Sequence, residues 1–271
     1  MKIIAKQTSF EQASRFVDIQ KLVQQTKNPT ENLFTRELQI IFLAFFCGFI
    51  ALLPLKNSFV ITSILITIIL ISLAFYFIIK SKNKSLSDFG WVIAKYMMVQ
   101  TLSISLVLGM RIDGNKPFGE FYLLLAFCYL IIILVLCYFR CSYLVQNYLR
   151  KHGMDIKESK TSKIWNKGMF KLSIGLVVII ILGTQFYRLI KWWFIKDDKS
   201  LDKISIQNEW LGTFVILVII GLLVVLLIVF SLLPILLFNA KVVVEGIMLK
   251  EYAEEFRNQS GLTENEWYGE K

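Results

Sequence analysis

The sequence predicts an all-α fold, a polytopic integral membrane bundle of helices, and three observations support it. Hydrophobic residues make up 56% of the 271 residues, and the mean hydropathy of +0.60 exceeds that of soluble domains. Six apolar runs have roughly the 20 residues that a helix needs to cross a bilayer core. These runs lack the period-two alternation of barrel strands, so each is expected to be a helix. The six predicted spans are 38–55, 58–79, 91–110, 119–139, 170–187 and 211–239.

The distribution of Lys and Arg predicts how the chain is oriented. The spans form one domain, 38–239, between an N-terminal segment (1–37) and a C-terminal tail (240–271). If both termini are inside, the inner segments carry 21 Lys and Arg and the outer loops carry 8. Short basic loops resist translocation, so both termini are predicted to be cytoplasmic. The net charge of +10 then reflects topology and attraction to the lipid bilayer, and no nucleic-acid partner is expected.

Residues 9–25 are predicted to form one amphipathic helix before the first span. In a helical projection Phe10, Phe16 and Val17 fall on the apolar half and the charged residues on the other, with only Leu22 misplaced. The sparse, mixed charge of the polar half favours docking against protein over insertion into lipid. Phe10, Phe16 and Val17 are therefore candidate partner-contact residues.

Turn and cap residues predict how the later elements follow one another. A short loop after Pro54 makes the first two spans antiparallel neighbours. The fourth span is expected to continue as a helix as far as a C-terminal cap at Gly153. The last run exceeds the bilayer thickness, and Pro234 is its predicted kink. The tail is expected to be helical, with a capping box of Thr263 and Glu266 before its final turn.

The third span carries Lys95, the only ionisable residue well inside an apolar run. In projection, Lys95 shares one broad arc with Gln100 and Ser103, whereas Thr101 and Ser105 lie on the far side. A helix that is polar all round is unsuited to lipid, so this span is predicted to be the most enclosed of the six. Lys95 is explained either by its stem reaching the headgroups or by an anion site that it forms with Gln100 and Ser103.

The sequence offers little chemistry, so no enzyme and no cofactor is predicted. A single histidine excludes a His-Glu-x-x-His metal site, and neither a nucleophile elbow nor a P-loop occurs. Cys137 and Cys141 share a helix face and His152 follows, but three scattered ligands fall short of a structural zinc site. The cysteines are expected to be unpaired packing thiols, and no metal is predicted.

The loop 188–210 is the largest exposed segment expected on the outer side. Trp192, Trp193 and Trp210 lie at its edges, where an interfacial aromatic belt is expected. Anchoring is the first interpretation of these tryptophans, and contact with a partner is the second.

The Ile/Leu/Phe/Lys/Asn-rich usage and the closing segment EEFRNQSGLTENEWYG resemble the small polytopic membrane proteins of low-GC Gram-positive bacteria. The resemblance concerns the style of the whole chain and transfers no functional residue. It implies a multi-pass protein of the bacterial plasma membrane. Such proteins serve either as immunity proteins at bacteriocin or toxin loci or as six-helix permease subunits of exporters.

The leading functional hypothesis is a non-enzymatic membrane component. An exporter permease would bind a separate ATPase subunit through the N-terminal helix and the inner loops, whereas an immunity protein would meet a secreted peptide or toxin through loop 188–210. A homo-oligomer is compatible with either. Two alternatives are an anion channel or carrier that uses Lys95 and an enzyme acting on a lipid-linked diphosphate. The carboxylates of that enzyme would be Asp197, Asp198 and Asp202.

Overall fold

The computed structural model describes residues 8–27, 32–110, 117–154, 160, 162–168, 171 and 209–268. Within these residues the regular structure is entirely helical, which confirms the predicted all-α class. The chain divides into two units, residues 1–162 with 231–271 and residues 163–230, and each is described by itself.

Four described helices are long and apolar enough to cross a membrane. They are α4 (Asn32–Ile50, extended by the 3-10 helix η1, Leu53–Lys56), α5 (Phe59–Lys82), α6 (Ser87–Leu108) and α7 (Pro117–Lys151). A fifth candidate is the bent combination of α9 (Glu209–Leu232), η3 (Leu233–Leu237) and α10 (Ala240–Glu251). These elements correspond to the first four predicted spans and to the last. The predicted span 170–187 lies outside the described residues apart from Lys171.

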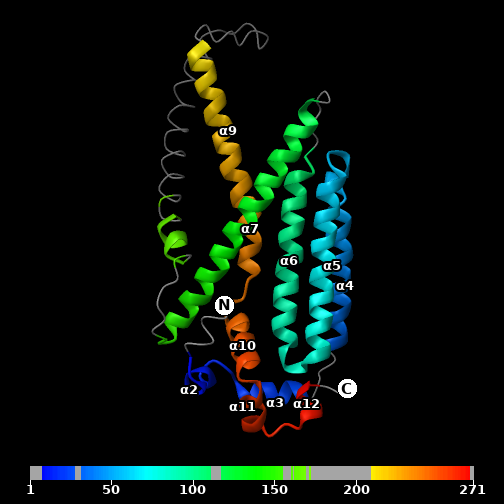
Figure 1. Cartoon of the computed structure of the whole chain (residues 1–271), viewed down its shortest axis with the longest axis vertical. Helices are drawn as coiled ribbons and strands as arrows, with labels where there is room; N and C mark the ends of the chain where they lie inside the picture. The colour runs from blue at the N-terminus through cyan, green and yellow to red at the C-terminus, as the bar shows by residue number, and fades with distance from the viewer. Residues whose placement is uncertain are drawn as a thin grey trace, which may run out of the picture. The chain divides into compact units, whose positions relative to one another are not determined.

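Helices α4, α5 and α6 run side by side as a three-helix bundle (Figure 1). The short 3-10 helix η2 (Lys84–Leu86) joins α5 to α6, and two ion pairs lie at this end of the bundle: Arg36 with Asp88, 2.5 Å apart, and Glu37 with Lys80. Of the apolar stretch of α6, 56% is buried, against 28%, 33% and 28% in α4, α5 and α7. Among these four helices α6 is therefore the most enclosed, in agreement with its polar residues.

The opposite face of α4 is apolar and exposed. Phe42, Phe45 and Phe49 are 69%, 75% and 63% exposed. Contiguous apolar surface of this kind is unfavourable in water but normal against lipid hydrocarbon. The outer surface of the bundle thus agrees with a membrane location.

The last span is broken at Pro234, where the sequence predicted a kink. The segments before and after the break, Gly221–Leu237 and Ala240–Glu251, differ in direction by 57°. Pro234 lies in the first turn of η3 and cannot donate a backbone hydrogen bond, so α9 cannot continue as an α-helix. After η3 the backbone becomes extended, and the Asn239 side chain accepts from the N–H groups of Lys241 and Val242 at 3.1 and 3.4 Å. Because α10 begins with its own cap, it is a separate helix, and the last span is interrupted rather than only bent.

The predicted single helix over 9–25 is wrong, because the structure has two short helices there. These are α2 (Phe10–Ser14) and α3 (Ile19–Lys27). The Asp18 carboxylate accepts from the Lys21 N–H at 3.1 Å and so starts a new helix. The change of direction turns Leu22, which a continuous helix would misplace, to the buried side, where it is 7% exposed.

Two predicted helix caps are confirmed. The cap beyond α7, Gly153, has a φ of 81°, and its N–H donates to the carbonyl of Arg150 at 3.0 Å. Thr263 and Glu266 form the predicted capping box, with the Thr263 N–H donating to the Glu266 carboxylate at 2.8 Å. The box begins the last helix, α12 (Glu264–Tyr268), whose Trp267 is fully buried.

The two ends of the chain meet at one end of the bundle. Helix α11 (Ala253–Ser260) and α12 both contact α3, and α12 also contacts η2 at the turn between α5 and α6 (Figure 1). The Phe10 ring packs edge-on against Phe256 at 5.1 Å between centroids. The N-terminal segment and the C-terminal tail are therefore on the same side of the three-helix bundle.

We predict that Gly246→Ala destabilises the protein. A Cβ at Gly246 would lie 2.4 to 2.6 Å from the inner atoms of the Phe89 side chain, so α10 would have to move away from α6. Overpacking of this kind costs about 1–3 kcal/mol, more than the 0.5–1 kcal/mol, roughly, that alanine gains over glycine within a helix. The free energy of unfolding in detergent, followed by circular dichroism, measures the effect.

The matched control is Gly48→Ala in α4. A Cβ there meets no atom within 4 Å, so this variant should be neutral or slightly more stable than the parent. Equal effects of the two substitutions would show that α10 does not pack closely on α6.

Candidate functional site

The break in the last span is held by a buried side chain of the third span. The Gln100 Nε2 donates to the backbone carbonyl of Ser231 at 2.6 Å, and the two residues are 4% and 0% exposed. In a 3-10 turn a carbonyl accepts from the N–H three residues later, which for Ser231 would be Pro234. Proline has no N–H, so Pro234 cannot make this bond, and the Gln100 amide donates to the same carbonyl.

A second polar contact joins the break to the fourth span. The hydroxyl groups of Tyr129 in α7 and Ser231 are hydrogen-bonded. Side chains from α6 and α7 therefore meet the last turn of α9 at Ser231. The remaining atom of the Gln100 amide, Oε1, is buried and accepts no hydrogen bond within the described residues. A buried acceptor left open costs about 1–3 kcal/mol, which makes this a polar junction with unused hydrogen-bonding capacity.

Lys95, Gln100 and Ser103 were considered as an anion site, the alternative to a lysine stem that reaches the headgroups. The Gln100 donor is occupied by Ser231, and its open atom is an acceptor, which repels an anion. Ser103 is buried at 6% exposure, whereas Lys95 remains partly exposed nearer the η2 end of α6. This partial exposure agrees with the reading in which the stem of Lys95 reaches towards the headgroups.

Two other polar groups of α6 are satisfied within their own helix. The Thr101 hydroxyl donates to the carbonyl of Met97 at 2.8 Å, and the Ser105 hydroxyl donates to that of Thr101 at 2.7 Å. Such bonds allow hydroxyl groups to be buried in an apolar bundle without a partner helix. Of the polar side chains that the sequence singled out in this span, Gln100 is the one with a hydrogen bond to another helix.

The candidate partner-contact residues at the N-terminus pack on their own chain, and their contact with a separate subunit stays a prediction. Phe10 lies against Phe256 of α11, and Phe16 lies 5.9 Å from the His152 ring beyond α7. Phe16 and Val17 are only 6% and 8% exposed. The apolar half of the segment docks under the bundle, as the mixed charge of its polar half favoured.

Several predicted candidates lie outside the described residues. The side chain of Trp210, at the start of α9, belongs to this group. The other members are Trp192, Trp193, Asp197, Asp198 and Asp202. Their suggested roles in anchoring, partner contact or diphosphate binding stay predictions.

The predicted packing thiols Cys137 and Cys141 are both buried, and both lie beside the Tyr96 hydroxyl of α6. His152 lies elsewhere, with its ring 4.2 Å from that of Tyr148. Within the described part of the chain, no group of three His, Cys, Asp or Glu side chains is placed to hold a metal ion.

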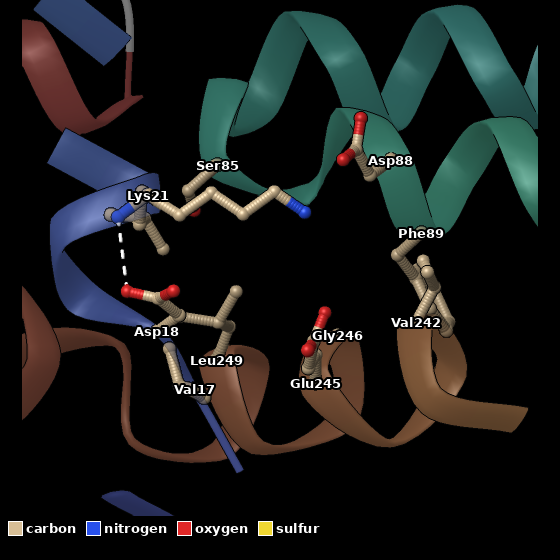
Figure 2. Close-up of a pocket in the computed structure, with 11 residues that line it drawn as sticks. Val17, Asp18, Lys21, Ser85, Asp88, Phe89, Val242, Glu245, Gly246 and Leu249 are labelled. Carbon is tan, nitrogen blue, oxygen red and sulfur yellow. Dashed lines mark hydrogen bonds between the residues drawn. The ribbon is translucent and has the colours of Figure 1, made fainter. Parts of the chain in front are cut away.

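A small pocket of about 40 Å³ lies between α3, the start of α6 and α10 (Figure 2). This volume is on the order of that of a single water molecule. Lys21, Asp88 and Glu245 extend into the pocket from the three elements, and Asp18 lines it as well. Burial raises the pKa of the Glu245 carboxyl, which lies beyond the predicted last span, while Lys241 and Lys21 act in the opposite direction.

Sequence reasoning missed three of the residues that build these two regions. Tyr129 was missed because a tyrosine within an apolar run does not indicate which residue its hydroxyl will bind, here Ser231. Asp18 could have been found, since Asp is a preferred N-cap and an apolar turn follows it. Glu245 belongs to the predicted tail helix, and only the contact with α3 shows its importance.

Comparison with known proteins provides no relative. The chain matches no family model, no curated protein and no solved structure. The function is therefore inferred from the helices and polar contacts of this chain alone.

We predict that Gln100→Leu lowers the free energy of unfolding by at most about 1 kcal/mol, the usual net value of one hydrogen bond, because removal of the open Oε1 acceptor offsets part of the loss. Leucine keeps most of the volume but leaves the carbonyl of Ser231 without the amide. Chemical denaturation in detergent micelles checks this value. Thr101→Val is the control, because it removes a bond within one helix, and it should cost clearly less. A loss as large in the control would mean that the amide does not stabilise the break.

Proposed function

We propose that the protein is a non-enzymatic permease component of a bacterial plasma membrane, with six spans and both termini in the cytoplasm. The observation that carries this proposal is the break of the last span against the polar residues of α6 and α7. Backbone that is not helical is tolerated at membrane depth only where it is buried in protein or lines an aqueous cavity. Transporters commonly bind their solutes at such discontinuous helices.

The chemistry of the break favours a neutral or hydrogen-bonding solute. Its polar groups are an amide, two hydroxyls and backbone carbonyls, supplied by Gln100, Tyr129 and Ser231. None of these groups carries a charge at neutral pH, and no Asp or Glu lies deep in a predicted span. Cation coupling, which depends on intramembrane carboxylates, is therefore disfavoured, and the energy must come from elsewhere.

The meeting of the two chain ends supports an even number of spans. Since α3 packs on α11 and α12, the segments before the first span and after the last are on one side. The four spanning helices, the broken last span and the predicted span 170–187 together make six. The η2 end, with Lys80, Lys82 and Lys84, is the more basic end of α5 and is assigned to the cytoplasm.

A separate ATPase subunit is the proposed energy source, because the chain has no P-loop of its own. The apolar residues of α2 and α3 face inward, so this subunit would meet the outward polar face, where Glu11 and Arg15 are exposed. An interface of this kind depends on charge and is expected to weaken as salt concentration rises.

The proposal predicts that water reaches the break. In a variant without the four native cysteines, Ser103→Cys, one turn from Gln100, should react with a membrane-impermeant maleimide severalfold faster than Ser72→Cys. Ser72 is a matched control, because it is also a buried serine within a span, with its hydroxyl bonded to its own helix at 2.6 Å. Labelling rates in membrane vesicles provide the measurement. Equal protection of both positions would contradict a permease path and leave the break as a purely structural feature.

A further inference from the structure

The position of α10 is determined by its packing and not by α9. The backbone at Phe238 and Asn239 is extended, with ψ angles of 111° and 97°, and Asn239 caps the first turn of α10. A helix with its own cap and an extended connection can change direction by rotation at two residues. Phe238 and Asn239 are therefore a hinge between the break and α10.

One side of α10 is closely packed. Val243, Val244 and Met248 are 0%, 1% and 0% exposed, and Gly246 brings the backbone of α10 close to the Phe89 side chain of α6. Buried apolar contacts of this kind hold α10 against the bundle. These contacts involve no titratable side chain, so a charge that controls the position of α10 must lie on another side of the helix.

The side of α10 that faces α3 is charged and incompletely filled. The pocket of about 40 Å³ separates the two helices, and the Glu245 side chain is only 19% exposed there (Figure 2). The groups facing Glu245 are Lys241 of α10 at 3.7 Å, Lys21 of α3 and Asp88 of α6. Asp88 is itself paired with Arg36 of α4. Because burial disfavours the charged carboxylate, a charge on Glu245 opposes this contact, whereas the apolar packing of α10 on α6 involves no charge.

The elements on the far side of the pocket form one body, which we call the terminal clasp: α2 and α3 together with α11 and α12. Phe10 joins its halves through Phe256, and the Tyr252 hydroxyl donates to the carbonyl of Thr8. Within the tail, the Tyr268 hydroxyl donates to Glu254 at 2.6 Å. Phe256 and Trp267 are almost completely buried in this body. Helix α3 therefore cannot leave α10 without the tail.

We propose that the terminal clasp is the inner gate of the permease, and that it closes on α10 when Glu245 is neutral and loosens when Glu245 is charged. This inference rests on the proposed function only where it interprets the clasp as a gate. The charge-controlled contact itself is supported by the hinge, the pocket and the contacts that join α2 and α3 to α11 and α12.

The direction of control follows from burial. In the structure, burial raises the pKa of the Glu245 carboxyl above its ordinary value, and an open clasp that exposes the carboxyl to water would return the pKa towards that value. A raised pKa in the closed state means that closure is favoured at low pH and becomes less stable as pH rises through that pKa. Lys241 and Lys21 act in the opposite direction, because they lower the cost of the charged carboxylate. Neutralising Glu245 should therefore tighten the clasp, and removing Lys21 should loosen it.

The test measures opening at Leu22, which is 7% exposed on the clasp side of the pocket. In the full-length protein without native cysteines, Leu22→Cys is labelled with a water-soluble maleimide at pH 7. Adding Glu245→Gln should slow labelling severalfold, and adding Lys21→Met should speed it severalfold. Glu264→Cys, on the exposed surface of α12, corrects for the reactivity of the reagent and should not change.

Hydrogen exchange of the protein with its native cysteines provides a second readout, in case Leu22→Cys folds poorly. At one fixed pH, peptides from α3 and α11 should exchange more slowly in Glu245→Gln and faster in Lys21→Met, and they should change together. Unchanged rates in both variants, or faster exchange in both, would overturn the charge-controlled clasp. Neither readout uses transport. If Ser103→Cys is protected while the clasp responds as expected, the permease assignment fails and the charge-controlled contact stands.

Discussion

The missing N–H of Pro234 is the constraint on which much of the described structure depends. In lipid a backbone polar group without a partner is costly, so backbone that departs from a regular helix is found where protein groups surround it. Gln100 donates to the carbonyl of Ser231 beside the break, which requires α6 to present a polar side chain in mid-span and to be enclosed by its neighbours. The same proline separates α10 from α9 and leaves it to be positioned by packing. One residue thus links the enclosed third span to the tail helices.

Two ion pairs lie at the end of the three-helix bundle where the chain termini meet. Arg36 and Glu37 begin the first span and pair with Asp88 and Lys80 across α6 and α5. Ion pairs that are partly exposed contribute little each, but here they fix neighbouring helix ends in register. The side chains at these pairs are about a third exposed, so the three-helix bundle depends mainly on apolar contact. The pocket beside Asp88 is different, because charged side chains line it and it is not filled by apolar ones.

Local signals were predicted well from the sequence, and contacts between distant segments were not. The described spans, the break at Pro234 and the caps at Gly153 and Thr263 each follow from residues within one turn of the feature. The role of Gln100 depends on Ser231, 131 residues later, and no pattern within the third span reveals it. The single helix predicted over 9–25 failed for a local reason. The apolar periodicity continues through Asp18, but the Asp18 side chain caps a new helix there, which ends the first one.

The packing of α10 on the bundle is separate from the course of α9. Burial of Val243, Val244 and Met248 favours this packing by about 1.5–3 kcal/mol for each side chain. Pro234 removes a backbone hydrogen bond at the break, and Asn239 starts α10 with a cap of its own. Small changes at the charged face of α10 therefore act on a helix whose position is set by its own contacts.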